Sequence, residues 1–146
     1  AVMTPPQVTM EIIQTNLVGT IYCCQIFSPL MFRNKSGSII NFSTIAVPLG
    51  LKGESVYVAS KAGIEGFSRS FAREAADFNV RVNCVAPGPI NTDLLKGVSS
   101  EQIDRIVSQQ VIPKQFIPSD VCDLVELLLD DKSASLSGQV LNVGGA

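Results

Sequence analysis

The sequence predicts an α/β domain built around a parallel sheet. Three short apolar runs are expected to be strands: 37–42 (GSIINF) and 80–88 (VRVNCVAPG) as strands buried on both faces, and 138–145 (GQVLNVGG) as a third short strand. Helical patterns separate these runs, and such an alternation builds parallel β–α–β units. Because three parallel strands would leave two unpaired edges, we expect this chain to form half of a doubly wound sheet.

The first helix is expected to begin near Met10, with Thr9 as its amino-terminal cap and Glu11 favourably placed against the helix dipole. The stretch that continues to Asn34 is apolar on several sides, which is typical of a buried helix. Pro29 should bend or end this helix, because proline lacks the backbone N–H and clashes with the preceding turn.

Three more helices are expected after the first strand. A long one over 54–77 is indicated by apolar residues at three- and four-residue steps, namely Ile64, Phe67, Phe71 and Ala75. Ser99 and Gln102 have the spacing of a capping box and predict a short helix of about ten residues. Ser119, which follows Pro118, is the expected cap of the last helix.

Composition excludes several classes of protein. A length of 146 residues suits one domain, and the 46% hydrophobic and 16% charged content suggests surface that is buried against another subunit or chain. A net charge of −2 argues against nucleic-acid binding. No run of 18 apolar residues is present, so no membrane span is expected. The first ten residues lack the pattern of a signal peptide.

The cysteines favour reduced thiols. Their spacing includes no C-x-x-C pair, and the sequence contains no histidine; the four are Cys23, Cys24, Cys84 and Cys122. We therefore expect an intracellular, cytoplasmic protein without a disulfide framework and without a metal site.

The segment YVASK contains two residues that could act together. Tyr57 and Lys61 lie four positions apart, on one face of a helix. A free tyrosine has a pKa of about 10, and a nearby ammonium favours its phenolate form. A pKa near 7 requires about 4 kcal/mol, which one lysine is not expected to supply alone, so a second positive charge would help. The alternative is an exposed pair on an amphipathic helix.

Two more segments follow the ends of predicted strands, where ligands bind in parallel sheets. Ser43 and Thr44 place hydroxyls after the first strand, where they could donate to a substrate carbonyl; turn formation is the alternative. In APGPINT at 86–92, two prolines restrict the backbone and Gly88 lets it approach a ligand closely. A rigid turn without a ligand is the alternative there.

In this order the segments resemble landmarks of the short-chain dehydrogenase/reductase family. The resemblance extends from Thr9 to Gly145 and includes GSIINFST, YVASKAG, RVNCVAPGPINT and LSGQVLNVGG; Tyr57 lies thirteen residues after Thr44, and Asn16 in NLVGT lies where the family keeps an asparagine. It is closest to 3-oxoacyl-carrier-protein reductase-like members. It implies a three-layer, Rossmann-like doubly wound sheet, with residues 1–146 as the carboxyl-terminal part of a single NAD(P)-binding domain.

The resemblance also implies roles for individual residues. Tyr57 would be the general acid in reduction and the base in the reverse direction. Lys61 would lower the pKa of Tyr57 and bind the nicotinamide ribose, and Asn16 would hold a water in a proton relay behind Lys61. Thr44 would orient the substrate carbonyl, with Ser43 as the alternative. The nicotinamide would be seated by Pro87, Gly88, Ile90 and Thr92.

The sequence departs from the family pattern at several places. Thr44 replaces the family's serine, which keeps the hydroxyl but adds a methyl that restricts χ1. Val47 replaces a common loop glycine. The family's glycine-rich turn, its N-N-A-G element and its adenosine-binding residue do not occur in these 146 residues. We therefore expect these residues alone to bind a dinucleotide poorly and to be inactive by themselves.

The function implied is hydride transfer between NADP(H) or NAD(H) and a carbonyl or secondary alcohol, with 3-oxoacyl thioesters among the candidate substrates. The resemblance also implies a homo-oligomer, a dimer or tetramer, through the helices at 10–32 and 54–77. One alternative is a truncated, non-catalytic homologue that serves as an oligomerisation or interaction module. Another is an epimerase or dehydratase that shares the tyrosine–lysine pair.

Overall fold

The fold is described here from a computed structural model, which covers residues 1–146 except for the side chain of Leu94. Its centre is a three-stranded parallel sheet in the order β1-β2-β3. The strands are β1 (Gly37–Phe42), β2 (Val80–Pro87) and β3 (Val140–Val143). The predicted α/β class with parallel strands is confirmed.

The register aligns the carboxyl ends of the strands. Phe42, the last residue of β1, lies opposite Val85 of β2, and Pro87 at the end of β2 lies opposite Val143 of β3. All three strands therefore end at the same edge of the sheet, which is where parallel α/β folds bind their ligands.

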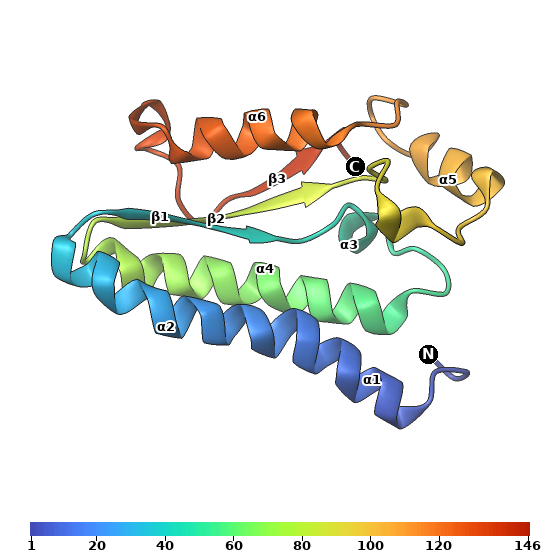
Figure 1. Cartoon of the computed structure of the whole chain (residues 1–146), viewed down its shortest axis with the longest axis horizontal. Helices are drawn as coiled ribbons and strands as arrows, with labels where there is room; N and C mark the ends of the chain where they lie inside the picture. The colour runs from blue at the N-terminus through green and yellow to red at the C-terminus, as the bar shows by residue number, and fades with distance from the viewer.

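Helices cover both faces of the sheet, which makes three layers (Figure 1). One face is covered by α2 and α4, with α1 packed against α4, and the other face by α6, while α3 and α5 lie toward the carboxyl edge. Their bounds are α1 (Pro6–Ile13), α2 (Gly19–Asn34), α3 (Ala46–Leu49), α4 (Ser55–Ala76), α5 (Ser100–Val107) and α6 (Pro118–Leu129). Short 3-10 turns span Asp93–Leu95 and Asp131–Ser133.

Two apolar cores hold the layers together. The core under α2 and α4 contains Cys24, Phe71, Ala72, Ala75, Val80 and Val82, and the core under α6 contains Val85, Phe116, Leu128 and Val143. Strand β2 contributes to both cores because successive side chains point to opposite faces. Full burial of each large aliphatic side chain contributes about 1.5–3 kcal/mol to stability. Strand β2 is therefore held firmly between the two helical layers, and it fixes the position of the loop that follows it.

Strand β1 differs from the prediction of a strand buried on both faces. Most of its residues are only half-buried, Asn41 is buried, and Phe42 is 45% exposed. The reason is its place at an edge of the sheet, beside β2 only. An apolar run alone does not distinguish an edge strand from a central one.

The first helix also differs from the prediction. It begins at Pro6, with Pro5 at the capping position, and Thr9 lies inside it, where its N–H donates to the Pro5 carbonyl at 3.0 Å. Proline suits the first helical turn because no N–H is required there. Pro29 does not end α2, which continues to Asn34. Packing of α2 on α4 and β1 outweighs the cost of about 3 kcal/mol for an interior proline.

The expectation of a buried helix over this stretch is wrong for this chain. One face of α2 packs inward, but its opposite face exposes Tyr22, Ile26, Phe27 and Leu30 to at least 56%. An apolar pattern on several sides therefore reflects a second face that the described residues do not cover.

The capping predictions have mixed outcomes. The capping box at the start of α5 is confirmed, because the Gln102 N–H donates to the Ser99 hydroxyl at 3.3 Å and the Ser99 N–H donates to the Gln102 side chain. Ser119 does not cap α6. Instead, the Ile117 N–H donates to the Asp120 carboxylate at 2.7 Å, which also places a negative charge in the first helical turn.

Candidate active site

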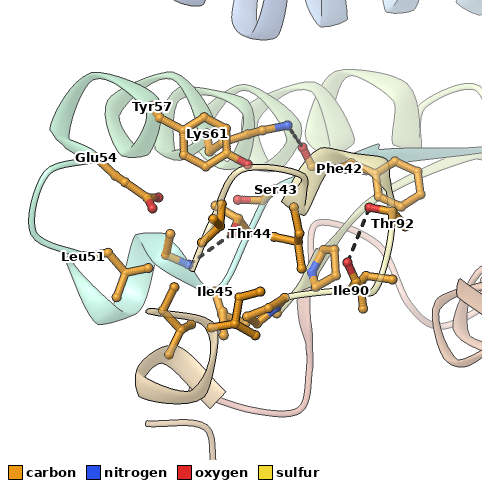
Figure 2. A pocket seen from close by; sticks show the side chains of 18 residues that line it. Phe42, Ser43, Thr44, Ile45, Leu51, Glu54, Tyr57, Lys61, Ile90 and Thr92 are labelled. Carbon is orange, nitrogen blue, oxygen red and sulfur yellow. Dashed lines mark hydrogen bonds between the residues drawn. The ribbon is translucent and has the colours of Figure 1, made fainter. Parts of the chain in front are cut away.

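A cleft of about 460 Å³ opens at the carboxyl edge of the sheet (Figure 2). The turn after β1 forms its floor, the first turns of α4 form one wall, and the loop after β2 with the segment around α5 forms the other. Segments far apart in sequence therefore meet there. The predicted site residues that line the cleft are Thr44 and its alternative Ser43, Tyr57, Lys61, Pro87, Gly88, Ile90 and Thr92.

Tyr57 and Lys61 lie one turn apart on α4, and their side chains share a face as the spacing predicts. The Lys61 Nζ atom lies 5.9 Å from the centroid of the Tyr57 ring. The same ammonium donates to the Phe42 carbonyl at 3.0 Å. The end of β1 therefore holds the lysine beside the phenol.

The phenol of Tyr57 rests in its protonated form. Burial raises the pKa of Tyr57, a hydrogen bond with Thr44 opposes that shift, and the negative charge of Glu54 adds to it. Burial also lowers the pKa of the Lys61 ammonium. Lys61 therefore does not by itself bring the pKa of Tyr57 down toward neutrality in this structure.

Thr44 and Ser43 have different surroundings, although they are neighbours in sequence. The Thr44 hydroxyl accepts from the Ala46 N–H at 3.2 Å and interacts with Tyr57. Ser43 is 4% exposed, and its hydroxyl donates to Glu65 Oε1 at 2.7 Å. The Thr44 hydroxyl therefore lies beside the phenol of Tyr57, whereas the Ser43 hydroxyl is engaged in a hydrogen bond with Glu65 of α4.

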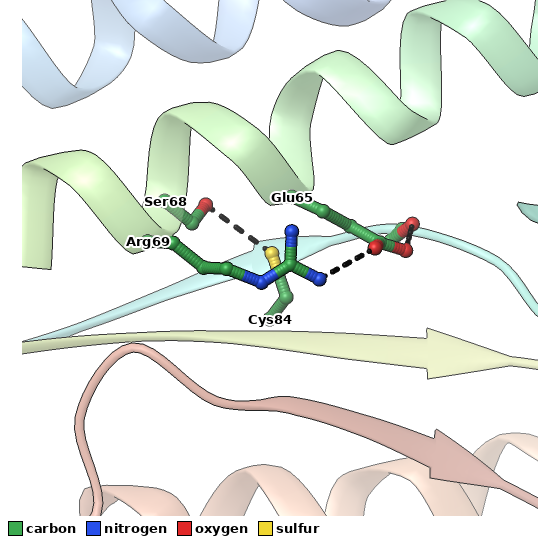
Figure 3. A network of polar contacts seen from close by, with 5 residues as sticks. Glu65, Ser68, Arg69 and Cys84 are labelled. Carbon is green, nitrogen blue, oxygen red and sulfur yellow. Dashed lines mark hydrogen bonds and ion pairs between the residues drawn. The ribbon is translucent and has the colours of Figure 1, made fainter.

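A buried polar layer lies behind the cleft, between α4 and the sheet (Figure 3). The Glu65 carboxylate accepts from Ser43 and also pairs with Arg69 at 3.1 Å. One turn further along α4, the Ser68 hydroxyl accepts from the Cys84 thiol at 3.2 Å. The layer ties the end of β1 and the middle of β2 to α4, and thereby stabilises the turn that carries Thr44.

Asn16 reaches the site from the other side of Lys61. It lies in a π-helical turn, Gln14–Val18, between α1 and α2. Its side-chain amide donates to the Ser60 hydroxyl at 3.0 Å, and Ser60 donates to the Tyr57 carbonyl at 2.6 Å. Asn16 and Lys61 also line a second cleft of about 410 Å³ between α2 and β1. Single π-helical turns within α-helices occur frequently at functional sites.

The loop after β2 lines the cleft with its prolines, Ile90 and Thr92. The Thr92 hydroxyl donates to the Ile90 carbonyl over a long 3.4 Å. A methyl group at Gly88 would collide with the side chain of Gln110 and approach Ile45 Cδ1 to 3.1 Å. A side chain at this position would therefore force Gln110 to move, so packing beneath the loop favours glycine there, whereas the sequence suggested only close approach by a ligand.

Several lining residues were not identified from the sequence. Glu54, at the capping position of α4, extends into the cleft near Tyr57. An apolar wall comes from both sides of the cleft and consists of Ile45, Leu51, Leu95, Val98, Ile103 and Ile106. The signal for Glu54 was its position three residues before Tyr57, which is one helical turn.

The described residues contain no group of three or more histidine, cysteine, aspartate or glutamate side chains that could hold a metal ion. Nor does any helix in the described part of the chain have the length and hydropathy to cross a membrane. All four cysteines are free thiols, with Cys24 and Cys84 buried.

Comparisons with known proteins show which proteins the chain is similar to. The sequence profile of the enoyl-(acyl carrier protein) reductase family matches residues 1–145. The chain is 37% identical over 135 residues to the 3-oxoacyl-[acyl-carrier-protein] reductase FabG of Staphylococcus aureus, covering 92% of the chain and 55% of the reductase. It is 38% identical over 137 residues to the FabG of Chlamydia muridarum, covering 92% and 54%.

A solved structure has the same fold. The crystal structure of 3-oxoacyl-[acyl-carrier protein] reductase from Brucella melitensis superposes with a TM-score of 0.88 at 28% identity, covering 98% of this chain and 55% of that one. The chain spans about half the length of the curated relatives it matches. From the matching profile, these relatives and the shared fold, we conclude that the chain belongs to the short-chain dehydrogenase/reductase family.

Proposed function

We propose that the protein is an NAD(P)-dependent oxidoreductase that transfers a hydride between a nicotinamide cofactor and a carbonyl or secondary alcohol. The observation that carries this proposal is the convergence of Thr44, Tyr57 and Lys61 on one cleft at the carboxyl edge of the sheet. These residues act on a proton and a carbonyl oxygen, and the bound cofactor supplies the hydride.

In the reducing direction, the substrate oxygen accepts hydrogen bonds from the hydroxyls of Thr44 and Tyr57. As negative charge develops on that oxygen, the protonated phenol transfers its proton to it. Because burial raises the pKa of Tyr57, the phenol carries the proton that this role requires. In the oxidising direction, the phenolate takes the proton from the alcohol, and a cationic cofactor beside it adds to the charge of Lys61 in stabilising that form.

Lys61 and Asn16 would serve the proton supply. The Lys61 ammonium uses one donor on the Phe42 carbonyl, so its other N–H groups remain for a ribose hydroxyl of the cofactor and for a water. Asn16 lines the second cleft with Lys61, which suits a water held between them. This arrangement would return a proton to Tyr57 after each reduction.

The loop after β2 fits the nicotinamide end of NADP(H) or NAD(H). Its lining residues offer an apolar surface and one hydroxyl, and they are Pro87, Gly88, Ile90 and Thr92. Because Thr92 makes only a long hydrogen bond of 3.4 Å within its own loop, its hydroxyl can turn to a carboxamide.

The apolar wall supports a substrate with an acyl chain. Leucine, isoleucine and valine side chains from Leu51 to Ile106 form most of this wall, and the proteins that the chain resembles are named 3-oxoacyl-carrier-protein reductases. We therefore propose 3-oxoacyl thioesters as the substrate class.

The exposed face of α2 supports assembly into a homo-oligomer, a dimer or tetramer, through the helices at 10–32 and 54–77. Its apolar side chains, Tyr22, Ile26, Phe27 and Leu30, would be covered by a second copy. Light scattering on the full-length protein, compared with an Ile26→Glu variant, tests this arrangement, and an unchanged monomeric mass for both would contradict it.

The proposed activity is tested with the full-length protein, NADPH or NADH, and a 3-oxoacyl thioester. We expect nicotinamide fluorescence to report binding and absorbance at the reduced-nicotinamide band to fall with turnover. The absence of both signals would refute the proposal and favour the non-catalytic, oligomerisation role.

A further inference from the structure

We infer that Glu54 sets the substrate specificity of the cleft, so that it accepts uncharged carbonyl compounds and rejects those that carry a carboxylate beside the ketone. This inference rests on the proposed function and concerns the same cleft. It names the substrate class by charge.

The position of Glu54 places its charge where the substrate binds. The residue precedes α4 and lies one helical turn before Tyr57, and its side chain lines the cleft with Thr44 and Leu51. Figure 2 shows the carboxylate directed into the cleft, on the side of Tyr57 that faces Leu51. A substrate whose oxygen contacts Tyr57 and Thr44 would therefore have its neighbouring groups near this carboxylate.

The folded structure does not use the Glu54 carboxylate. Only its backbone takes part in helix initiation, since its carbonyl accepts from the Val58 N–H at 2.7 Å and its N–H donates to the Leu51 carbonyl at 3.3 Å. Among the described residues, the carboxylate has no hydrogen-bond or ion-pair partner and caps no helix. Burial raises the pKa of the Glu54 carboxyl, and once ionised this half-buried group has no structural partner and is free to act on a ligand.

No cation on the substrate side compensates this charge in the described lining. The other ionisable groups there are the neutral phenol of Tyr57 and the ammonium of Lys61, which is held at the Phe42 carbonyl. The remaining wall is apolar: Leu51, Leu95, Val98, Ile103 and Ile106. In such surroundings a second carboxylate within a few ångströms is repelled far more strongly than in water.

Tyr57 is near enough to be affected by this charge: burial is the main cause that raises the pKa of Tyr57, and the negative charge of Glu54 adds to it. A developing or permanent negative charge at the substrate position would be affected in the same sense. In a 3-oxoacyl thioester the group one methylene away from the ketone is a neutral thioester, whereas the free 3-oxo acid of the same chain length has a carboxylate there. The two compounds therefore differ in charge at this position, and only the acid would be repelled by the Glu54 carboxylate.

The experiment compares these two substrates in the full-length protein with NADPH. One is a 3-oxoacyl N-acetylcysteamine thioester and the other is the freshly prepared 3-oxo acid of equal chain length. The readout is the ratio of kcat/KM for the acid to that for the thioester, measured for wild type, Glu54→Gln and Glu54→Ala. Glu74→Gln is the matched control, because Glu74 is exposed near the far end of α4.

We expect the acid-to-thioester ratio to rise about tenfold or more in both Glu54 variants, from the loss of like-charge repulsion at short range. Glu74→Gln should leave the ratio at the wild-type value. The inference is overturned if the thioester is reduced but the ratio stays unchanged in both Glu54 variants, or if the acid remains unreactive in them. If neither compound is reduced by any of these proteins, the proposed function itself fails.

Discussion

Removal of the Ser43 hydroxyl should mainly affect stability, whereas removal of the neighbouring Thr44 hydroxyl should mainly affect turnover. Ser43→Ala deletes a buried hydroxyl whose oxygen lies 2.7 Å from Glu65 Oε1 and donates a hydrogen bond to it. Thr44→Ala deletes a hydroxyl at the cleft whose only backbone partner among the hydrogen bonds described is the Ala46 N–H, at 3.2 Å. The first change should lower stability, and the second should lower turnover.

The magnitudes follow from these partners. A hydrogen bond to a charged group contributes about 1.5–3 kcal/mol, so Ser43→Ala should lower the free energy of unfolding by that amount. A neutral bond contributes about 0.5–1.5 kcal/mol, which bounds the loss for Thr44→Ala. Loss of one donor to a developing oxyanion typically lowers kcat by about 10²–10³. Thr44→Ser keeps the donor without the methyl group, so activity should be retained or raised.

Urea unfolding and steady-state oxidation of NADPH, both on the full-length protein, measure the two effects separately. The reasoning predicts a crossed pattern, with Ser43→Ala less stable but active and Thr44→Ala stable but slow. If Ser43→Ala abolishes turnover while Thr44→Ala is silent, the substrate-orienting role belongs to Ser43 and the assignment is wrong by one residue.

Three other substitutions probe different parts of the account. Glu54→Gln removes a charge that raises the pKa of Tyr57, so the midpoint of the pH–rate profile for alcohol oxidation should move to lower pH; an unmoved midpoint would contradict this. Gly88→Ala should lower the free energy of unfolding by about 1–3 kcal/mol, as measured in urea, and adding Gln110→Ala should relieve the collision. Glu65→Ala should cost about 2–3 kcal/mol in the same assay, and Glu65→Gln should cost less; equal losses would show that the charge is irrelevant.

Much of the fold could be predicted because its signals are local. The three strands and the long helix α4 are encoded in apolar runs and in three- and four-residue repeats, and their predicted bounds lie within a few residues of the observed ones. The start of α1 was missed because Thr9 is a good cap in isolation, whereas Pro5 and Pro6 were the better signal. The exposure of β1 and α2 depends on neighbours in space, which periodicity does not describe.

The site divides in the same way. Residues with a defined spacing, such as Tyr57 and Lys61, could be placed on one helical face before the structure was known. Glu54 has only its spacing from Tyr57 as a signal, and the residues of the apolar wall have none, so their role becomes visible only from the cleft around them. The different surroundings of Ser43 and Thr44 could not be predicted either, because only the buried Glu65, distant in sequence, distinguishes the two neighbouring hydroxyls.

Turnover by a Tyr57→Phe variant of the full-length protein tests the central claim most directly. Phenylalanine keeps the ring and removes only the acidic hydroxyl, so fold and cofactor binding should persist, as checked by circular dichroism and nicotinamide fluorescence. The account predicts that oxidation of NADPH in the presence of a 3-oxoacyl thioester falls to background in this variant. Near-normal oxidation would contradict the assignment of Tyr57 as the acid and base of the reaction.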